Sequence, residues 1–268
     1  MDLASKRVGS FTVNYFENCI DPDFLMQQFH DPESIVRKGR GGIKVLRIGQ
    51  DLLACRRYMH GGILRAITGG IFFSEKRTAY EFKILAFLQE NGFPVVHPCG
   101  YLVNKNLFTK DLYLLTFFEE NTLDLLEFLK TAPRRKRLRA IRNFARLLFK
   151  MGELGVYHPD LHLQNVLIRK TGELVFLDFD RALLKQVSRK DMENMLWRLE
   201  RYVAKKDRAG ELATTAEEKM LFLRTIERLS GVRFIEAMEK RMGGKRRLNK
   251  LGWLMESTFY GKQGKING

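Results

Sequence analysis

Residues 158–165 read His158-Pro159-Asp160-Leu161-His162-Leu163-Gln164-Asn165, and Asp178-Phe179-Asp180 begins thirteen residues after Asn165. The first stretch is expected to be a loop, and a hairpin between the two stretches is expected to bring Asp178 back beside it. A carboxylate that can accept a proton would then lie close to two oxygen ligands of the kind that Mg²⁺ prefers. The spacing therefore predicts a site with a base, Asp160, and two metal ligands, Asn165 and Asp178.

These two stretches resemble the H-R-D-x-x-x-x-N and D-F-G elements of protein kinases. Transfer of a γ-phosphoryl group needs a carboxylate that orients and deprotonates the acceptor hydroxyl, together with oxygen ligands for Mg²⁺. The resemblance implies ATP and Mg²⁺ as cofactors. The alternative is that these stretches are only two acidic turns next to strands. Two matched elements at the family spacing are far more specific evidence for a kinase than either element alone.

Elements upstream agree in order and spacing with an ATP site. Leu53-Ala54-Cys55-Arg56 falls where kinases carry V-A-I-K, so Arg56 replaces the lysine that holds the phosphates. Glu81, on the following helix, is expected to pair with Arg56. Arg57 takes that role instead if the strand phase is shifted by one residue. The remaining expected nucleotide-binding residues form a phosphate-covering loop, Gly39, Arg40, Gly41 and Gly42.

Several departures from the protein-kinase motifs favour a small-molecule acceptor over a protein acceptor. Pro159 replaces the arginine that reads a phosphorylated activation loop, Asp180 replaces the glycine of D-F-G, and no A-P-E element follows. His162 stands where protein kinases mostly carry lysine, and the D-L-H-x-x-N form is similar to that of aminoglycoside and choline kinases. His162 either structures the loop through a hydrogen bond to Asp160 or takes part in phosphoryl transfer, and the residues leave both open.

Hydrophobic periodicity predicts a β-rich first half and an α-rich second half, and hence a bilobal α+β protein. The resemblance to kinase motifs implies that this is the protein-kinase-like fold. Within a single domain, residues 1–36 are expected to be an N-terminal arm, 37–118 the N-lobe and 119–268 the C-lobe, with the joint near Phe117–Asn121. The expected strands are Ile43–Ile48, Leu52–Tyr58, Leu112–Phe118, Asn165–Arg169 and Leu174–Leu177. The expected helices are Thr78–Asn91, Thr122–Lys130 and Arg134–Leu154, with mostly helical structure from Asp191 on.

The composition of the chain indicates the cellular compartment and the kinds of binding partner to expect. The chain has 268 residues and a formal net charge of +16, which favours nucleic acid, an anionic membrane surface or an acidic substrate as partner. No apolar run reaches the ~18–20 residues that span a bilayer, and the N-terminus lacks an apolar signal region, so we expect a cytoplasmic protein. The three cysteines, Cys19, Cys55 and Cys99, form no C-x-x-C pair, which argues against a disulfide framework or a zinc site.

Further segments carry a more specific resemblance, which covers roughly Arg37–Tyr202. They are similar to motifs of bacterial lipopolysaccharide kinases, above all those acting on 3-deoxy-D-manno-octulosonic acid (Kdo). The matching segments are Arg56–Leu64 (R-x-Y-x-x-G-G), Arg77–Leu85 (R-x-x-x-E-F-x-x-L), Gly92–Pro98 (G-x-P-V-x-x-P), Asp111–Thr116, Tyr157–Leu161 (Y-H-x-D-L), Leu177–Arg181 (D-F-D-R) and Asn194–Leu199.

This resemblance implies ATP-dependent phosphorylation of a Kdo hydroxyl on a lipid A precursor, at the cytoplasmic face of the inner membrane. Asp160 would be the base, Asn165 and Asp178 the Mg²⁺ ligands, and Arg56 with Glu81 the phosphate clamp. Heptose kinases of the lipopolysaccharide core are close enough that the acceptor sugar stays open. A small atypical Ser/Thr protein kinase is a second enzymatic alternative, and a pseudokinase or basic RNA-binding module is a non-enzymatic one.

Two basic clusters offer a reason for the net charge. Arg135, Arg139, Arg142 and Arg146 are spaced so that they share one face of the long helix, and Lys240, Arg241, Lys245–Arg247 and Lys250 lie near the C-terminus. An anionic membrane would attract both clusters, at about 1 kcal/mol for each basic group before screening. The alternatives are a solvated helix face, a disordered tail or a nucleic-acid patch. We expect contact with the membrane and no nucleic-acid partner.

Overall fold

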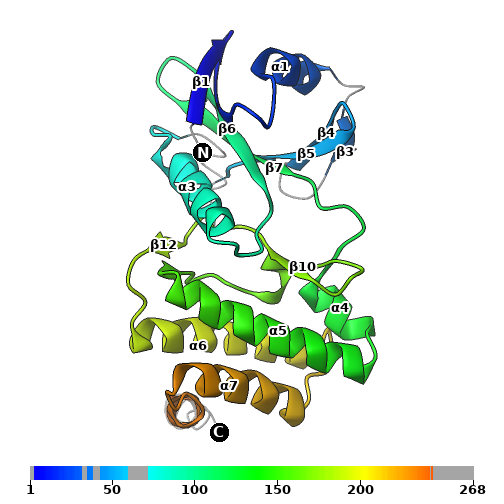
Figure 1. Cartoon of the computed structure of the whole chain (residues 1–268), viewed down its shortest axis with the longest axis vertical. Helices are drawn as coiled ribbons and strands as arrows, with labels where there is room; N and C mark the ends of the chain where they lie inside the picture. Colours follow the sequence, from blue (N-terminus) through cyan, green and yellow to red (C-terminus); the bar gives the residue numbers. More distant parts are fainter. Residues whose placement is uncertain (1–2, 32–34, 39–42, 60–71, 242, 244–268) are drawn as a thin grey trace, which may run out of the picture.

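The computed structural model describes residues 3–31, 35–38, 43–59, 72–241 and 243. Its dominant feature is a seven-stranded antiparallel sheet at one end of the molecule, with helices α4 to α7 at the other (Figure 1). In spatial order the strands are β1 (Leu3–Val8), β2 (Phe11–Phe16), β6 (Pro98–Lys105), β7 (Lys110–Phe117), β5 (Asp51–Arg57), β4 (Ile43–Ile48) and β3 (Ile35–Lys38).

The first residues are more than an arm. They form β1 and β2, which extend the sheet beside β6, and helix α1 (Pro22–His30). The Asp21 side chain accepts a hydrogen bond from the Phe24 N–H at 2.8 Å and caps the helix, with proline at its first position. The buried face of α1 packs with β2, β4 and β5 in an apolar cluster that includes Cys55, which is a core residue as expected.

The predicted hairpin of Ile43–Ile48 with the strand that follows is confirmed. It forms β4 and β5 in register Ile43↔Arg56. The predicted helix of residues 78–91 is also present, as α3 (Lys76–Glu90). Gly92, just past the C-cap residue Asn91, has a φ of 62°, which suits a residue without a Cβ. Because α3 packs against β6 and β7, its buried face carries Glu81 toward the sheet.

The second half begins with a correction. The helix expected at 122–130 starts at Leu125 instead, because the Asp124 side chain caps it by accepting from the Glu127 N–H at 2.9 Å. The strand expected at 165–169 starts at Val166, after a short 3₁₀ turn. The elements are β8 (Leu123–Asp124), α4 (Leu125–Thr131), α5 (Arg134–Glu153), β9 (Val156–Tyr157), η3 (Leu163–Asn165), β10 (Val166–Ile168), β11 (Leu174–Phe176), β12 (Leu183–Leu184), α6 (Arg189–Arg208) and α7 (Ala216–Ser230).

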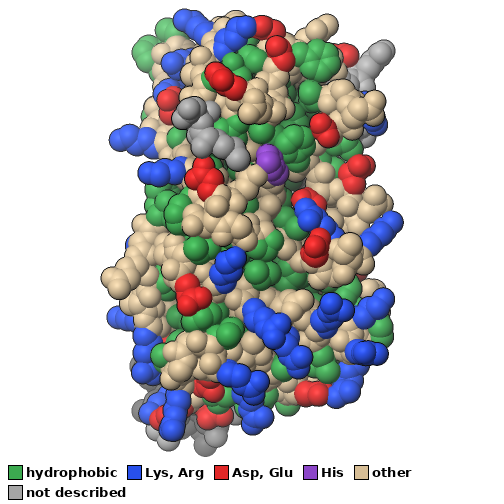
Figure 2. Space-filling view, viewed as in Figure 1, with side chains coloured by type: hydrophobic (Ala, Val, Ile, Leu, Met, Phe, Trp, Pro, Cys, Tyr) green, Lys and Arg blue, Asp and Glu red, His purple; other side chains and the backbone are tan. Residues whose placement is uncertain are grey.

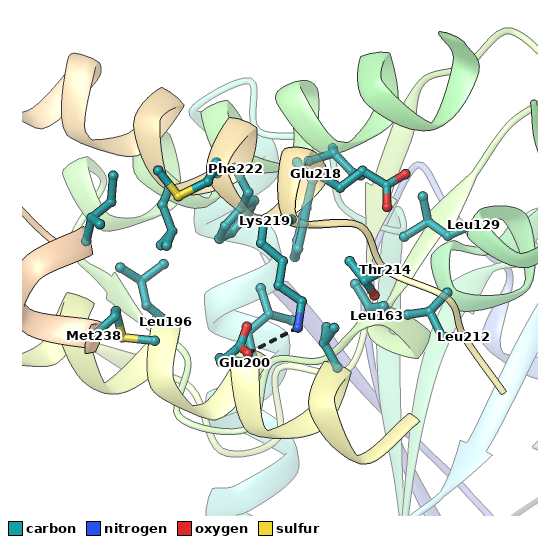
Figure 3. A pocket seen from close by; sticks show the side chains of 18 of the residues that line it. Leu129, Leu163, Leu196, Glu200, Leu212, Thr214, Glu218, Lys219, Phe222 and Met238 are labelled. Atoms are coloured by element: carbon teal, nitrogen blue, oxygen red, sulfur yellow. Dashed lines mark hydrogen bonds and ion pairs between the residues drawn. The ribbon is translucent and has the colours of Figure 1, made fainter. Parts of the chain in front are cut away.

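Helices α4 to α7 enclose an apolar cavity of about 250 Å³ beneath the 3₁₀ turn η3 (Figure 3). Leu163 of η3 and Leu196 of α6 both line this cavity, so η3 and α6 border the same apolar surface, which we call the shared floor. The polar pair at its wall is Lys219 and Glu200, whose Nζ and Oε1 are 3.3 Å apart. The shared floor fixes α6 beside the loop of residues 158–165.

The fold is thus a mixed α and β structure, as predicted, and its large sheet is antiparallel. The division into two lobes that meet near residues 117–121 stays a prediction. One apolar cluster runs from α3 through the hairpin β10–β11 to α5, α6 and α7. Among the described helices, none is long and apolar enough to cross a membrane.

Candidate active site

The hairpin β10–β11 brings the two conspicuous sequence stretches together. Val166 pairs with Phe176, and the Leu177 N–H donates to the Asn165 carbonyl at 3.0 Å. Asp178 follows directly, with a φ of 64°, in the left-handed region that aspartate enters more readily than most residues. Asn165 and Asp178 therefore lie at the same end of the hairpin, next to the loop that carries Asp160.

Arg56 of β5 joins α3 to this hairpin. Its Nη2 donates to both carboxylate oxygens of Glu81 at 2.6 Å, and its Nη1 donates to Asp178 Oδ1 at 3.0 Å. Burial alone would lower the pKa of Arg56, but the charges of Glu81 and Asp178 raise it, so the guanidinium stays positive. One arginine thus holds a strand, a helix and the Asp178 carboxylate in fixed relation.

Glu81 is enclosed, with an exposed fraction of 1%. Besides Arg56, the Tyr58 hydroxyl donates to its Oε2, and the Phe179 N–H donates to its Oε1 at 3.0 Å. Burial raises the pKa of Glu81, and the Arg56 charge is the largest influence that lowers it. A buried carboxylate needs such donors, because an unpaired charge in the interior costs several kcal/mol.

Arg57 takes a different partner. Its Nη2 donates to Asp111 Oδ1 on β7 at 2.6 Å, on the other face of the strand from Arg56. Successive side chains of a strand point to opposite faces, so only one of the two arginines can face α3. In this structure that residue is Arg56, the one aligned with the lysine of V-A-I-K, and the alternative with Arg57 in its place does not hold.

Arg77 and Asp180 form a second link between α3 and the hairpin. Both nitrogens of one edge of the guanidinium, Nε and Nη2, donate to the two oxygens of Asp180. Sequence reasoning noted both residues as parts of motifs and missed that they pair. Asp180, which replaces the glycine of D-F-G, thereby ties the segment after Asp178 to α3.

Asp160 is held by α6 and by its own loop. Arg198 Nη2 donates to Asp160 Oδ1, and the two side chains are 42% and 38% exposed. Asn165 Nδ2 donates to the Asp160 carbonyl oxygen at 3.5 Å, which leaves the side-chain oxygen of Asn165 without this partner. Sequence reasoning missed Arg198, although the segment 194–199 stood out as a helix motif.

His162 lies flat against Tyr202 of α6, with ring centroids 4.9 Å apart and an angle of 10° between the planes. The Tyr202 hydroxyl donates to Gln164 Oε1 at 2.7 Å. Burial lowers the pKa of His162, which keeps it neutral at pH 7. No hydrogen bond joins His162 to Asp160 in the part of the chain that the structure describes, so stacking is the contact that positions this ring.

His158 begins the loop and is buried against Phe179, with ring centroids 5.1 Å apart. Neither ring nitrogen makes a hydrogen bond of ordinary geometry among the described residues, although the Asp178 backbone lies near enough to act on the pKa of His158. Burial lowers the pKa of His158 to about 4, against the opposing charge of Asp178. A neutral, enclosed imidazole suits a structural support better than a proton carrier.

The donor set fits one Mg²⁺ held partly by substrate. The oxygen of Asn165 and the second oxygen of Asp178 remain for a cation, and Mg²⁺ commonly takes one or two protein oxygens and completes its shell with phosphate and water. Within the described ranges, no group of three or more His, Cys, Asp or Glu side chains could hold a metal by itself. The expected phosphate-covering residues 39–42 fall between β3 and β4, outside the described residues.

Comparison with known proteins places the chain in a family. The model of the lipopolysaccharide kinase (Kdo/WaaP) family matches residues 30–225. A 3-deoxy-D-manno-octulosonic acid kinase of Vibrio cholerae is 29% identical over 171 residues, which are 62% of this chain and 71% of the relative. One of Actinobacillus succinogenes is 28% identical over 187 residues, 63% of this chain and 77% of the relative. Both alignments cover most of the relative's length.

Proposed function

This chain belongs to the lipopolysaccharide kinase (Kdo/WaaP) family and is a phosphotransferase, and we propose that it uses Mg²⁺ and ATP to phosphorylate a hydroxyl of Kdo on a lipid A precursor. The observation that carries the proposal is the joining of Arg56 to Glu81 and Asp178 beside the loop of Asp160 and Asn165. A phosphate clamp, two metal ligands and a base then border one space, as phosphoryl transfer requires.

Each residue of the site has its own role in the proposed transfer of phosphate. Asp160 orients the acceptor hydroxyl and takes its proton while the new O–P bond forms and the bond from the γ-phosphorus to the bridging oxygen of ADP breaks. Arg56, kept charged by Glu81, binds the phosphates of ATP. Asn165 and Asp178 would hold Mg²⁺, which when bound neutralises the charge on the phosphates.

The direct test is phosphate transfer from γ-labelled ATP to Kdo linked to a lipid A precursor. We expect transfer that needs Mg²⁺, and Asp160→Asn is expected to lower kcat by about 10²–10⁴-fold, the usual contribution of a general base. The matched control is Asp111→Asn, since Asp111 pairs with Arg57 away from the loop. Undiminished transfer by Asp160→Asn would refute the assignment of the base.

Competing acceptors are separated in the same assay. Heptosylated core without Kdo tests the heptose alternative, and a generic protein tests the Ser/Thr kinase alternative. A pseudokinase or RNA-binding module would transfer phosphate to none of them. We expect the Kdo-bearing acceptor to give the highest kcat/KM. The two relatives described above align with this chain over most of their own length, and both are named as Kdo kinases.

We also propose that a groove between α5 and α7 rests on an anionic membrane. The groove measures about 640 Å³, and its four guanidinium groups make no ion pair with any residue that the structure describes. Figure 2 shows Lys and Arg side chains gathered over this end of the molecule. Two of these arginines, Arg142 and Arg146, belong to the predicted stripe on α5, and all four arginines of that stripe are exposed. The groove is lined by Arg142, Arg146, Arg224, Arg228 and Leu229 and also by Glu217, which is itself paired with Arg134.

Charge complementarity favours lipid head groups as the occupant. Each arginine near an anionic surface contributes about 1 kcal/mol, so Arg224→Gln with Arg228→Gln should weaken binding to phosphatidylglycerol vesicles by about 30-fold. The control Lys76→Gln with Lys83→Gln removes the same charge from α3, and little loss is expected. Equal losses for both pairs would mean that net charge alone matters. Release by millimolar inorganic phosphate would point to a soluble anion as the ligand.

A further inference from the structure

The pairing of Arg198 with Asp160 is an unusual arrangement for a proposed base. An acceptor hydroxyl must reach Asp160, yet one of its oxygens already accepts from Arg198 Nη2. Both side chains are about two-fifths exposed, and ion pairs this open to water contribute only about 0–1 kcal/mol. An incoming anion of suitable shape can therefore replace Asp160 on Arg198 at little cost.

Arg198 also has an unused donor. Its Nε is buried and has no hydrogen-bond partner among the described residues. Nε and Nη2 form one edge of a guanidinium, and a carboxylate fits that edge with both oxygens. Four other arginines of the described chain fill this edge completely, each with one carboxylate: Arg77, Arg134, Arg137 and Arg169. Arg198 uses only half of it.

The surroundings hold this edge beside the loop. Tyr202 lies one turn after Arg198 on α6, on the same face, and stacks on His162 while it bonds Gln164. The shared apolar floor of Leu163 and Leu196 fixes the helix below (Figure 3). The position of Arg198 relative to the base is thus set by contacts on both sides, as a binding residue requires.

We propose that Arg198 binds the carboxylate of an acidic sugar acceptor. The carboxylate takes Nε and Nη2 together, Asp160 leaves Arg198, and the freed carboxylate of Asp160 turns to the acceptor hydroxyl. Arg198 remains protonated throughout, so the exchange moves no proton. This inference rests on the proposed function and deepens it, because it makes the negative charge of the sugar the property by which the site selects its acceptor. A neutral sugar would leave the base paired.

Two acceptors that differ only in this charge test the proposal. One is Kdo on a lipid A precursor, and the other is the same molecule with its carboxylate converted to a neutral amide. The wild-type enzyme is expected to prefer the acid. Arg198→Gln should raise the KM for the acid by about 10- to 100-fold, as expected for loss of hydrogen bonds to a charged group. The ratio of kcat/KM between the two acceptors should then approach one.

Controls keep other roles apart. Arg208→Gln removes the same charge from the far end of α6 and should keep the preference for the acid. Arg198→Lys retains the charge without the planar edge and should give an intermediate preference, which also serves if Arg198→Gln does not fold. KM for ATP should stay unchanged in both Arg198 variants.

Three results would overturn the proposal. If Arg198→Gln lowers kcat equally on both acceptors and keeps their ratio, Arg198 only positions Asp160. If it raises KM for ATP, Arg198 contacts nucleotide. If the wild-type enzyme uses the amide as well as the acid, Kdo is an acceptor but its charge is not read. Wild-type enzyme that phosphorylates neither molecule would instead refute the proposed function itself.

Discussion

Arg56 donates through one nitrogen to both oxygens of Glu81 and through another to Asp178, and so connects a strand, a helix and the end of a hairpin. Residue 178 is 122 positions away from residue 56 along the chain. The planar guanidinium can serve two carboxylates at once, whereas an ammonium is a point charge on a flexible stem. The choice of arginine over lysine here follows from that geometry.

Arg56→Lys tests this point. Lysine keeps the charge but loses one of the two directed contacts, and we expect kcat/KM for ATP to fall by about 10- to 100-fold, the loss typical for a hydrogen bond to a charged group. Steady-state kinetics at saturating acceptor measures it. Arg57→Lys, on the opposite face of β5, is the control, and an equal loss there would contradict the assignment of Arg56.

The pair of Arg77 and Asp180 should be coupled. Arg77→Gln and Asp180→Asn each break the same bidentate contact, so the double variant is expected to lose less stability than the sum of the two. Contacting residues show coupling of about 0.5–3 kcal/mol. Urea unfolding of all four proteins gives the value. Strict additivity would show that the contact contributes nothing in solution.

Two neighbouring glutamates on α7 should differ sharply in their effect on stability. Glu218 is buried and accepts from Arg137 on α5 at 2.6 and 2.8 Å, whereas Glu217 pairs with Arg134 at the exposed surface. Glu218→Ala leaves the partly buried charge of Arg137 without a carboxylate, with the Ala213 carbonyl as a remaining acceptor, and should cost about 3 kcal/mol. Glu217→Ala should cost about 0–1 kcal/mol. Equal free energies of unfolding for the two variants would refute this prediction.

Glu218 also predicts a pH dependence. Burial alone would raise its pKa, but the hydrogen bonds from Arg137 and the Thr215 backbone lower it below the ordinary 4.5. Because the folded-state pKa is the lower one, the stabilisation is complete above pH 4.5 and is lost as the pH falls through the folded value. The difference in unfolding free energy between wild type and Glu218→Ala should therefore shrink in acid. A difference that is constant down to pH 3 would contradict it.

Cys19 should be a reactive thiol. A hydrogen bond with Cys99 and the neighbouring His97, whose Nε2 is 3.8 Å from its sulfur, lower the pKa of Cys19 to about 6. Burial raises the pKa of Cys55 to about 12. Because the thiolate is the nucleophile, alkylation by iodoacetamide should reach Cys19 first, with a midpoint near pH 6, and mass spectrometry identifies the site. His97→Ala should move the midpoint upward. Faster labelling of Cys55 would contradict the prediction.

Local pattern was enough for the elements around the site. The alternation in residues 43–48, the turn at Gly49 and the helix stop at Gly92 all lie within a few residues of the structure they specify. The N-terminal strand β2 was missed although Phe11 and Val13 alternate with polar residues, a readable period of two. The Asp21-Pro22 start of α1 was a second available signal.

The sequence by itself determined the loop of Asp160 and Asn165, the hairpin that returns Asp178, and the strand that carries Arg56 and Arg57. These depend on spacing and on the periods of helix and strand, which act over short stretches. Only the tertiary structure decided that Arg198 meets Asp160, that Arg77 meets Asp180, and that Tyr202 covers His162. Those contacts join residues 38 to 103 positions apart, and they exist because the packing of α6 and α3 against the loop and the hairpin sets where each long side chain ends.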